Sequence, residues 1–262
     1  MWNARKRKAH TVRKSRPSIG EAVRVYAVGD IHGRFDLMIE LLGIICVDAD
    51  SKADNRSTQI VFLGDYVDRG DETAQVLTAL QSLDKPAVGG ITFLRGNHED
   101  ALLTFLADPV SGRRWLDFGA DQTLASYGVD LPPRNPTNND LRQTRDKLRA
   151  AMHDHVAFLG AMPFNKWYGN VLFTHAGCNA SAKDVELDVK AMMWGHPSAL
   201  IDEPVPGALV VHGHYDSVEP VNCRGRICVD TGAYYSGRLT AVRLDQDVTF
   251  LSTGMRPSRS VE

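Results

Sequence analysis

The chain of 262 residues is long enough for one large domain or two small ones, and its hydrophobic content of 43% suffices for a substantial core. No apolar run reaches the roughly 18 residues that a membrane-spanning helix needs, and no apolar segment follows the basic start as it would in a secretory signal. The net charge of −2 is unevenly distributed, because residues 1–20 hold seven Lys or Arg and no Asp or Glu.

Residues 1–22 are predicted to be a basic, disordered arm because they lack apolar periodicity. The arm is either a solvated tail without a partner or a contact for a polyanion such as nucleic acid, anionic lipid or an acidic protein. Residues 23–255 are predicted to form a single domain, followed by a tail over 256–262. The scattered cysteines favour a reducing compartment, so we expect a cytoplasmic protein without a membrane span.

Strands and helices alternate along the first hundred residues of the domain. Apolar periodicity predicts strands at 24–28, 59–63 and 91–94, and helices at 35–45, 72–83 and 99–106. Three successive strand–loop–helix units imply a parallel sheet, in which the loops that follow the strands meet at one edge. Ligand-binding residues are therefore expected in these three loops.

Residues 108–162 break this alternation and are predicted to be a helical insertion near the site. Helical patterns cover 114–127 and 141–159, and a Pro- and Asn-rich loop at 131–140 joins them. Strands return at 171–174, 208–211, 226–229, 239–244 and 248–251. The last three are short, and we expect them to be antiparallel, with Arg224 and Gly225 forming a hairpin turn.

Polar strings follow each of the first three strands, and lone histidines follow two later ones. The strings are Gly29-Asp30-Ile31-His32-Gly33, Gly64-Asp65-Tyr66-Val67-Asp68-Arg69-Gly70 and Gly96-Asn97-His98-Glu99, and the lone histidines are His175 and His214. Carboxylates, an amide oxygen and imidazoles together are a ligand set for two neighbouring divalent metals. The ordered set is much more specific than any single string.

Several of these side chains suit different tasks. The two carboxylate oxygens of Asp65 can bridge two metals, whereas Asp68 lies further along its loop and can orient a neighbour. Arg69 offers a planar fork of donors for phosphate oxygens. Because successive residues diverge, His98 points away from the metal-facing Asn97 and is free to donate a proton.

Two further residues have local interpretations. Glu99 lies at the start of a helix, where a carboxylate is favoured, so it is predicted to be a helix cap. His212 competes with His214 for the last ligand position, because residues two apart in a strand point to the same side. We prefer His214, since the strand pattern ends there, and His212 then contacts substrate or supports a ligand.

The motifs resemble those of the phosphoprotein phosphatase family of calcineurin-like metallophosphoesterases, and are most similar to small bacterial and lambda phage Ser/Thr protein phosphatases. The resemblance implies an α/β fold, namely a four-layer α/β/β/α sandwich. It also implies a first metal held by Asp30, His32 and Asp65, and a second metal held by Asp65, Asn97, His175 and His214. In this family pattern His98 is the general acid, Asp68 orients it, and Arg69 holds phosphate.

The chain departs from the pattern at one position. Phage-like members carry a Trp-x-Arg string whose arginine is a second phosphate clamp, and the matching string here is Trp194-Gly195-His196. His196 is therefore a candidate substrate-binding residue. The other candidates to replace the missing arginine are Arg95, Arg224 and Arg238.

The sequence thus favours a Ser/Thr phosphoprotein phosphatase that attacks phosphomonoesters with a hydroxide bridging two divalent metals. We expect Mn²⁺, with Fe and Zn²⁺ as alternatives that accept the same ligands. The expected partner is a phosphoprotein or a small phosphorylated substrate. A hydrolase of diadenosine tetraphosphate is the alternative function. A non-catalytic binding module is the third possible function. Such a module would be expected to have lost a metal ligand or the acid, and this chain has lost neither.

Overall fold

The first of two five-stranded sheets contains the predicted parallel strands. In the computed structural model, which describes residues 18–52, 54–84 and 90–254, the parallel strands are β1 (Val23–Val28), β2 (Ser57–Phe62) and β3 (Ile91–Phe93). Two antiparallel strands, β9 (Thr240–Leu244) and β10 (Val248–Ser252), extend the sheet to the order β10-β9-β1-β2-β3. The loops after β1, β2 and β3 therefore open on the same edge, as predicted.

The second sheet has the order β4-β5-β6-β8-β7. Its strands are β4 (Asn165–Tyr168), β5 (Val171–Thr174), β6 (Leu209–His212), β7 (Val221–Cys223) and β8 (Arg226–Cys228). The predicted turn at Arg224 and Gly225 joins β7 to β8 in an antiparallel hairpin, but β8 also pairs in parallel with β6. The expectation that β8 is antiparallel therefore holds for its pairing with β7 and is wrong for its pairing with β6, because the unrecognised three-residue strand β7 reverses the chain before β8 begins.

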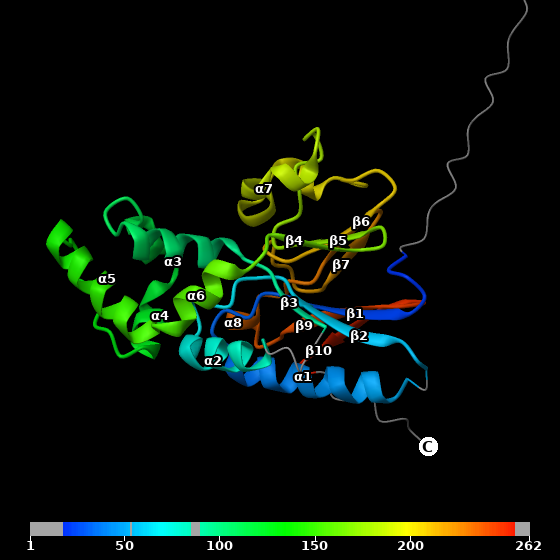
Figure 1. Cartoon of the computed structure of the whole chain (residues 1–262), viewed down its shortest axis with the longest axis horizontal. Helices are drawn as coiled ribbons and strands as arrows, with labels where there is room; N and C mark the ends of the chain where they lie inside the picture. The colour runs from blue at the N-terminus through cyan, green and yellow to red at the C-terminus, as the bar shows by residue number, and fades with distance from the viewer. Residues whose placement is uncertain (1–17, 53, 85–89, 255–262) are drawn as a thin grey trace, which may run out of the picture.

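The alternation of side chains in β1 divides the core into layers. Val25 and Ala27 face the second sheet, whereas Tyr26 and Val28 face the helices α1 (Phe35–Asp50) and α2 (Thr73–Leu83). On the other side of the molecule, α7 (Val189–Trp194) lies over the second sheet (Figure 1). The order of layers confirms the predicted α/β/β/α sandwich.

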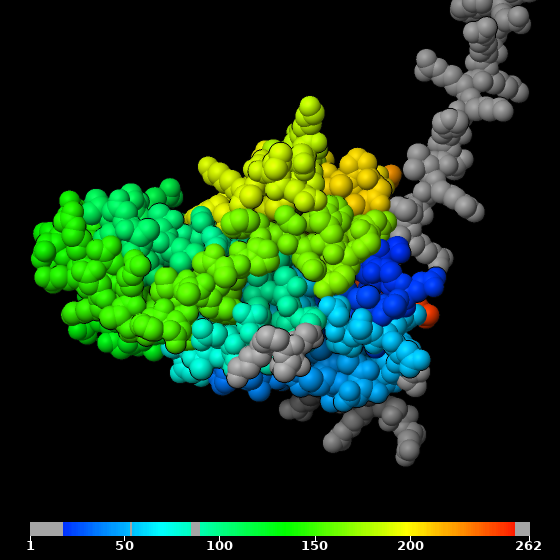
Figure 2. All heavy atoms as spheres, viewed as in Figure 1, coloured from blue at the N-terminus to red at the C-terminus, as the bar shows by residue number. Residues whose placement is uncertain are grey.

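Helices of the insertion form a lobe at one end of the molecule, drawn in green (Figures 1 and 2). After α3 (Asn97–Ala107), the lobe contains the 3-10 helix η2 (Arg113–Phe118), α4 (Ala120–Ser126), α5 (Asn138–Met152) and α6 (Asp154–Ala161). Each predicted long helix is broken at a residue with positive φ, namely Gly119 at 88° and His153 at 22°. A right-handed helix cannot continue through such a residue.

The predicted disordered arm over 1–22 was too long at its C-terminal end. Ile19 is buried between the two sheets, and the backbone of Ser18 exchanges hydrogen bonds with Asn170. Residues 1–17, on which the polyanion prediction rests, and the tail 256–262 lie outside the described residues. Among the residues that are described, no helix is both long and apolar enough to cross a bilayer.

An ion-pair network joins β1 to β9 and α1 at the end of the sheet opposite the motif loops. Arg24 pairs with Asp245 at 3.1 Å, and Arg243 pairs with Asp245 at 3.2 Å and with Asp48 at 2.8 Å. Burial raises the pKa of Asp245 and of Asp48. Hydrogen bonds and guanidinium groups, those of Arg24 and Arg243 for Asp245 and that of Arg243 for Asp48, outweigh burial and lower both pKa values below the ordinary range.

We predict that replacing Asp245 by Asn makes the free energy of unfolding less dependent on acidic pH. The folded-state pKa lies below the unfolded-state value, so the stabilisation is complete above about pH 4–5 and is lost as the pH falls through the folded pKa. Urea unfolding at a series of pH values from about 3 to 7 measures this slope. Asp121→Asn, at an exposed aspartate of the lobe, is the control. Equal slopes in wild type and Asp245→Asn would contradict the prediction.

Candidate metal centre

The loops after β1 and β2 are held together by their backbones. The amide groups of Ile31 and His32 both donate to the carbonyl of Asp65, at 3.0 and 2.8 Å, and Gly33 donates to Tyr66 at 2.9 Å. These bonds bring the side chains of two motifs that are more than thirty residues apart to one edge of the sheet.

Several residues of the site have an unfavourable backbone conformation. Seven described residues other than glycine have positive φ, and five of them are predicted site residues: His32, Asp65, Asp68, Arg69 and His214. Such conformations cost of order 1–3 kcal/mol each and persist only where the surrounding structure enforces them. Their concentration at this edge marks it as the functional part of the molecule.

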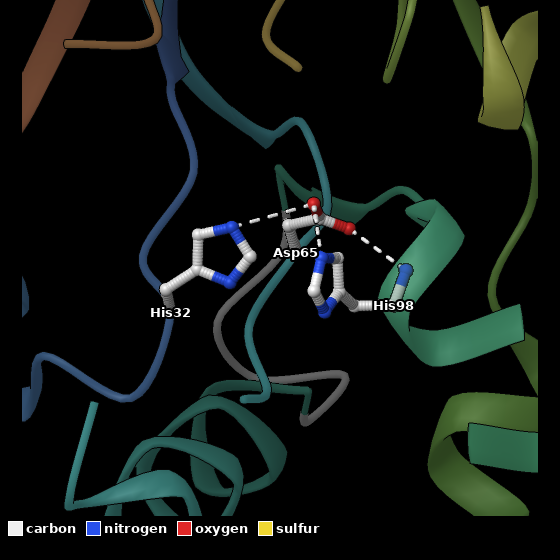
Figure 3. Close-up of side chains that lie close together, drawn as sticks. All are labelled: His32, Asp65 and His98. Atoms are coloured by element: carbon white, nitrogen blue, oxygen red, sulfur yellow. Dashed lines mark hydrogen bonds and ion pairs between the residues drawn. The ribbon is translucent and has the colours of Figure 1, made fainter. Parts of the chain in front are cut away.

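Asp65 lies at the centre of the cluster and is almost fully buried (Figure 3). One carboxylate oxygen is 3.5 Å from Nε2 of His32, and the other is 3.4 Å from Nε2 of His175. Each oxygen thus faces a different histidine, which is the arrangement that a carboxylate bridging two metals requires. Burial raises the pKa of Asp65, but His175, His98 and His32 outweigh burial and lower the pKa below its usual range.

Asn97 joins the second half of the cluster. Its amide oxygen lies 2.9 Å from Nε2 of His175 and 3.0 Å from Nδ1 of His214. The donor atoms of Asp65, His175 and His214 all lie within 4.8 Å of one another, as do those of His32, Asp65 and His98. The structure thus brings five of the six predicted ligands into one buried cluster.

The protonation of the histidines shows that this cluster fits a cation. Nδ1 of His175 contacts the carbonyl of Leu63 at 3.0 Å, and Nδ1 of His32 contacts the carbonyl of Val67 at 2.9 Å. A carbonyl oxygen accepts only from an N–H, so Nδ1 of each ring has the proton, and burial, which lowers the pKa of both imidazoles, to about 3 for His32, disfavours a second proton on Nε2. Each Nε2 therefore directs a lone pair at the oxygens of Asp65 or Asn97. A divalent cation satisfies such converging acceptors.

Asp30, the sixth predicted ligand, is buried beside the cluster but belongs to neither group of donor atoms. Its carboxylate accepts the backbone N–H of His214 at 3.1 Å, and burial, Asp230 and Asp65 raise its pKa well above the usual range. Asp30 lies so close to the backbone of Gly213 that a Cβ atom at position 213 would be 2.0 Å from the Asp30 carboxylate. Glycine is therefore required at position 213.

His98 and Asp68 form a buried pair next to Asp65. Nδ1 of His98 donates to Asp68 at 2.8 Å, and the backbone N–H of His98 donates to Asp65 at 3.1 Å. The predicted orienting role of Asp68 therefore matches the geometry, and Nε2 of His98 remains on the side of Asp65, 3.9 Å away. Burial lowers the pKa of His98, but Asp65 and Asp68 outweigh burial and raise it above its ordinary value.

The residues that hold Asp68 were not among those predicted from the sequence. Trp115 donates its indole N–H to Asp68 at 3.0 Å, and the hydroxyl of Thr123 donates at 2.7 Å. Both residues belong to the helical insertion, so the lobe touches the site as predicted, through the orienting carboxylate. A tryptophan and a threonine without a motif carry no sequence signal for such a role.

Glu99 does more than the predicted capping. It accepts the backbone N–H of Gly96 at 2.9 Å, which confirms the cap, and also those of Asp65, Tyr66 and Val67 at 2.8 to 3.2 Å. The carboxylate therefore ties the loop after β2 to the start of α3. From sequence alone, a Glu that caps a helix and also holds a neighbouring loop cannot be distinguished from a Glu that only caps the helix.

Arg69 is exposed at the mouth of the site. Its guanidinium carbon lies 4.8 Å from the ring centroid of Tyr234, a residue that sequence reasoning did not select, in the short helix α8 (Ala233–Ser236). The Tyr234 ring also packs against His32, with centroids 5.6 Å apart. Tyr234 therefore lies between Arg69 and the predicted ligand His32.

The remaining predicted residues have local partners. Nδ1 of His196 contacts the hydroxyl of Ser198 at 2.7 Å and caps the 3-10 turn Pro197–Leu200, so its substrate role stays a prediction. His212 ends β6, with Nδ1 2.9 Å from the carbonyl of Gly213. The rings of His212 and His214 both pack against Tyr215, with centroids 5.9 and 4.8 Å apart, but the preferred residue, His214, is the one whose donor atom joins the cluster.

The three arginines proposed to replace the missing phosphate clamp are engaged elsewhere. Arg224 pairs with Glu203 and Arg238 pairs with Glu219, each at 2.8 Å. Arg95 donates to the carbonyl of Gly160 at 2.6 Å. In the described part of the chain, Arg69 is thus the predicted phosphate-binding arginine that lies beside the cluster.

Comparisons with known proteins agree with this chemistry. The family model for calcineurin-like phosphoesterases matches residues 23–216. Serine/threonine-protein phosphatase SIT4 of Candida albicans is 39% identical over 80 residues, which are 30% of this chain and 24% of that protein. The match thus spans about a quarter of the length of that relative.

Longer matches come from two other proteins. Bis(5'-nucleosyl)-tetraphosphatase PrpE of Anoxybacillus flavithermus is 26% identical over 237 residues, which are 82% of this chain and 88% of that protein. The crystal structure of a metallophosphoesterase from Sphaerobacter thermophilus has a TM-score of 0.50 and 17% identity, and covers 90% of this chain and 89% of that one. The structural likeness supports the fold.

We predict that Asp65→Asn removes most of the bound divalent metal, because a carboxylate that bridges two ions supplies a charged ligand to each of them. Elemental analysis of the purified variant after dialysis against Mn²⁺ measures the metal content. Asp146→Asn, at an aspartate whose side chain is 67% exposed on α5, serves as the control and keeps its metal. A wild-type metal content in Asp65→Asn would exclude the bridging role.

Proposed function

Because this chain belongs to the calcineurin-like phosphoesterase family, we propose that it is a metal-dependent Ser/Thr phosphoprotein phosphatase. It would hydrolyse phosphomonoesters by direct attack of water, without a phosphorylated enzyme. Two divalent ions would be held by the predicted ligand set, with Asp65 shared between them. When bound, such ions lower the pKa of a shared water and stabilise charge on the phosphate oxygens. Mn²⁺ is the first candidate, and Fe and Zn²⁺ are the alternatives.

The observation that carries the proposal is the buried pair of His98 and Asp68. Asp68 accepts the Nδ1 proton of His98, which leaves the Nε2 side of the ring directed toward Asp65. The leaving group of a Ser or Thr phosphate is an alkoxide, which needs a proton as its bond to phosphorus breaks. Acid assistance of this kind contributes typically 10²–10⁴ in rate.

Arg69 supplies the second element of the proposal. Its guanidinium is exposed at the mouth of the site, and within the described residues no carboxylate pairs with it. The planar donors can therefore bind two phosphate oxygens of a substrate. His196 stays a weaker candidate for the same task because one of its ring nitrogens caps a turn.

A second function is supported by the extent of one match. The PrpE tetraphosphatase aligns with 82% of this chain, whereas the SIT4 phosphatase aligns with 30%. Hydrolysis of diadenosine tetraphosphate releases a nucleotide phosphate, which is a better leaving group than an alkoxide and has less need of an acid. The pair of His98 and Asp68 therefore favours a phosphomonoester as substrate, whereas the length of the PrpE alignment favours a phosphoanhydride.

A substrate panel with Mn²⁺ distinguishes the two functions. The substrates are a phosphoserine peptide, a phosphotyrosine peptide, diadenosine tetraphosphate and an aryl phosphate, compared by kcat/KM. We expect the phosphoserine peptide to exceed diadenosine tetraphosphate. The reverse order, with little hydrolysis of either peptide, would replace the proposed function by the second one.

We predict that His98→Asn lowers kcat on the phosphoserine peptide by about 10²–10⁴-fold and on an aryl phosphate by much less. An aryloxide leaves without a proton, so loss of the acid matters less for it. Steady-state kinetics on both substrates, with metal content measured in parallel, test the prediction. His153→Asn, at an exposed histidine of the lobe, is the matched control. Equal losses on both substrates would remove His98 from the acid role.

A further inference from the structure

We propose that Tyr234 is a positioning residue for phosphate binding, which holds the Arg69 guanidinium over the mouth of the metal centre by stacking on it. The inference rests on the proposed function in that it takes Arg69 as the group that binds the phosphate. Tyr234 lies outside the sequence motifs, and its contact with Arg69 gives a physical reason for the orientation of that arginine.

The stacking fixes Arg69 without using its hydrogen-bond donors. The guanidinium carbon lies 4.8 Å from the centroid of the Tyr234 ring, which is within the range of a cation–π contact. Such a contact needs no hydrogen-bond acceptor, so it leaves the guanidinium N–H groups available to phosphate oxygens. A carboxylate partner would hold Arg69 equally well but would occupy the donors that phosphate needs.

Tyr234 is itself held in place from several sides. Its ring packs edge-to-face against His32, with centroids 5.6 Å apart at 80°, and against Tyr235, with centroids 5.0 Å apart at 83°. The start of α8 is anchored because Arg34 donates to the carbonyl of Ala233 at 3.0 Å and pairs with Asp36 at 2.7 Å. The ring is therefore a fixed support between a predicted metal ligand and the phosphate-binding arginine.

The backbone of Arg69 needs such a support. Its φ of 70° places it in the left-handed region, and its N–H donates to the carbonyl of Gly119 at 2.9 Å. The backbone is thus fixed by the lobe, but the long side chain extends into solvent and would lose rotamer entropy on binding phosphate. Stacking on Tyr234 restricts that freedom before the ligand arrives, which lowers the cost of binding.

The experiment is a double-mutant cycle on the Mn²⁺-loaded enzyme with Tyr234→Leu, Arg69→Ala and the double variant. The probe is inorganic phosphate, measured by calorimetry, together with KM and kcat on an aryl phosphate. We expect Tyr234→Leu to weaken phosphate binding and raise KM by about 3- to 20-fold while kcat changes less. In the Arg69→Ala background, Tyr234→Leu should have almost no further effect.

Two tyrosine variants serve as controls. Tyr234→Phe keeps the aromatic face and should bind phosphate as wild type does. Tyr235→Phe removes the hydroxyl that donates to Asp216 but keeps the ring that packs against Tyr234, and it should leave phosphate binding unchanged. Metal content and thermal unfolding are measured for every variant, so that a loss of the metal centre or of the fold is recognised.

Several outcomes would overturn the inference. These are wild-type phosphate binding in Tyr234→Leu, additive effects of the two single changes, or a loss of metal that accounts for the weaker binding. If Tyr234→Leu does not fold, an Arg69→Lys variant that binds phosphate as wild type does would also reject it, because Lys lacks the planar stacking face. Failure of the phosphoserine peptide as a substrate, with the phosphate cycle intact, would reject the proposed function and leave the role of Tyr234 standing.

Discussion

The geometry of the whole site depends on one buried carboxylate, that of Glu99, and the backbone N–H groups that it accepts. These groups come from Gly96, at the start of α3, and from three consecutive residues of the loop after β2. Without this acceptor the loop would have buried, unpaired donors, each costing about 1–3 kcal/mol. The same bonds hold Asp65 at a φ of 54°, so the position of the central carboxylate follows from a residue that does not itself face the metal cluster.

The charge of Glu99 is in turn linked to that of the centre. Burial and the nearby carboxylate of Asp65 raise the pKa of Glu99 to about 7. Without a bound cation, this carboxylate therefore tends to take up a proton. Asp30 and Asp230 show the same effect, since burial raises the pKa of each, to about 6 for Asp230. Bound cations reverse this tendency because they favour the ionised carboxylates. The cluster of acids and imidazoles therefore fits a bound cation.

Most of the site could be predicted from sequence because its residues follow strands in a regular order. Asp30, Asp65 and Asn97 each come shortly after a strand of the parallel sheet, and topology alone brings such positions to one edge. The supporting residues could not be found in this way. Trp115 and Thr123 reach Asp68 only because the lobe folds back on the site, and this packing leaves no local pattern.

Limits of the same kind explain the errors in the fold. The helical pattern over 141–159 continues through His153, but the backbone there turns to a φ of 22° so that α5 and α6 can pack at an angle against α3. Likewise β7 has only three residues, too few for an alternation to be recognised. Periodicity reports which face of a segment is buried, whereas the point at which a segment breaks is decided by its neighbours in space.

The attachment of the lobe to Asp68 connects the fold to the proposed chemistry. The orienting carboxylate is fully buried and accepts bonds from His98, Trp115 and Thr123. Burial raises the pKa of Asp68, and the hydrogen bonds from these three donors offset part of that rise. Two of the donors belong to the lobe, so the lobe favours the ionised form of Asp68, which accepts the His98 proton. The proposed metal ligands come from the sheet edges, and the support of the proposed acid comes from the insertion. If His98 is the acid, a change in the lobe would alter how well it protonates a leaving group and leave the ligand cluster intact.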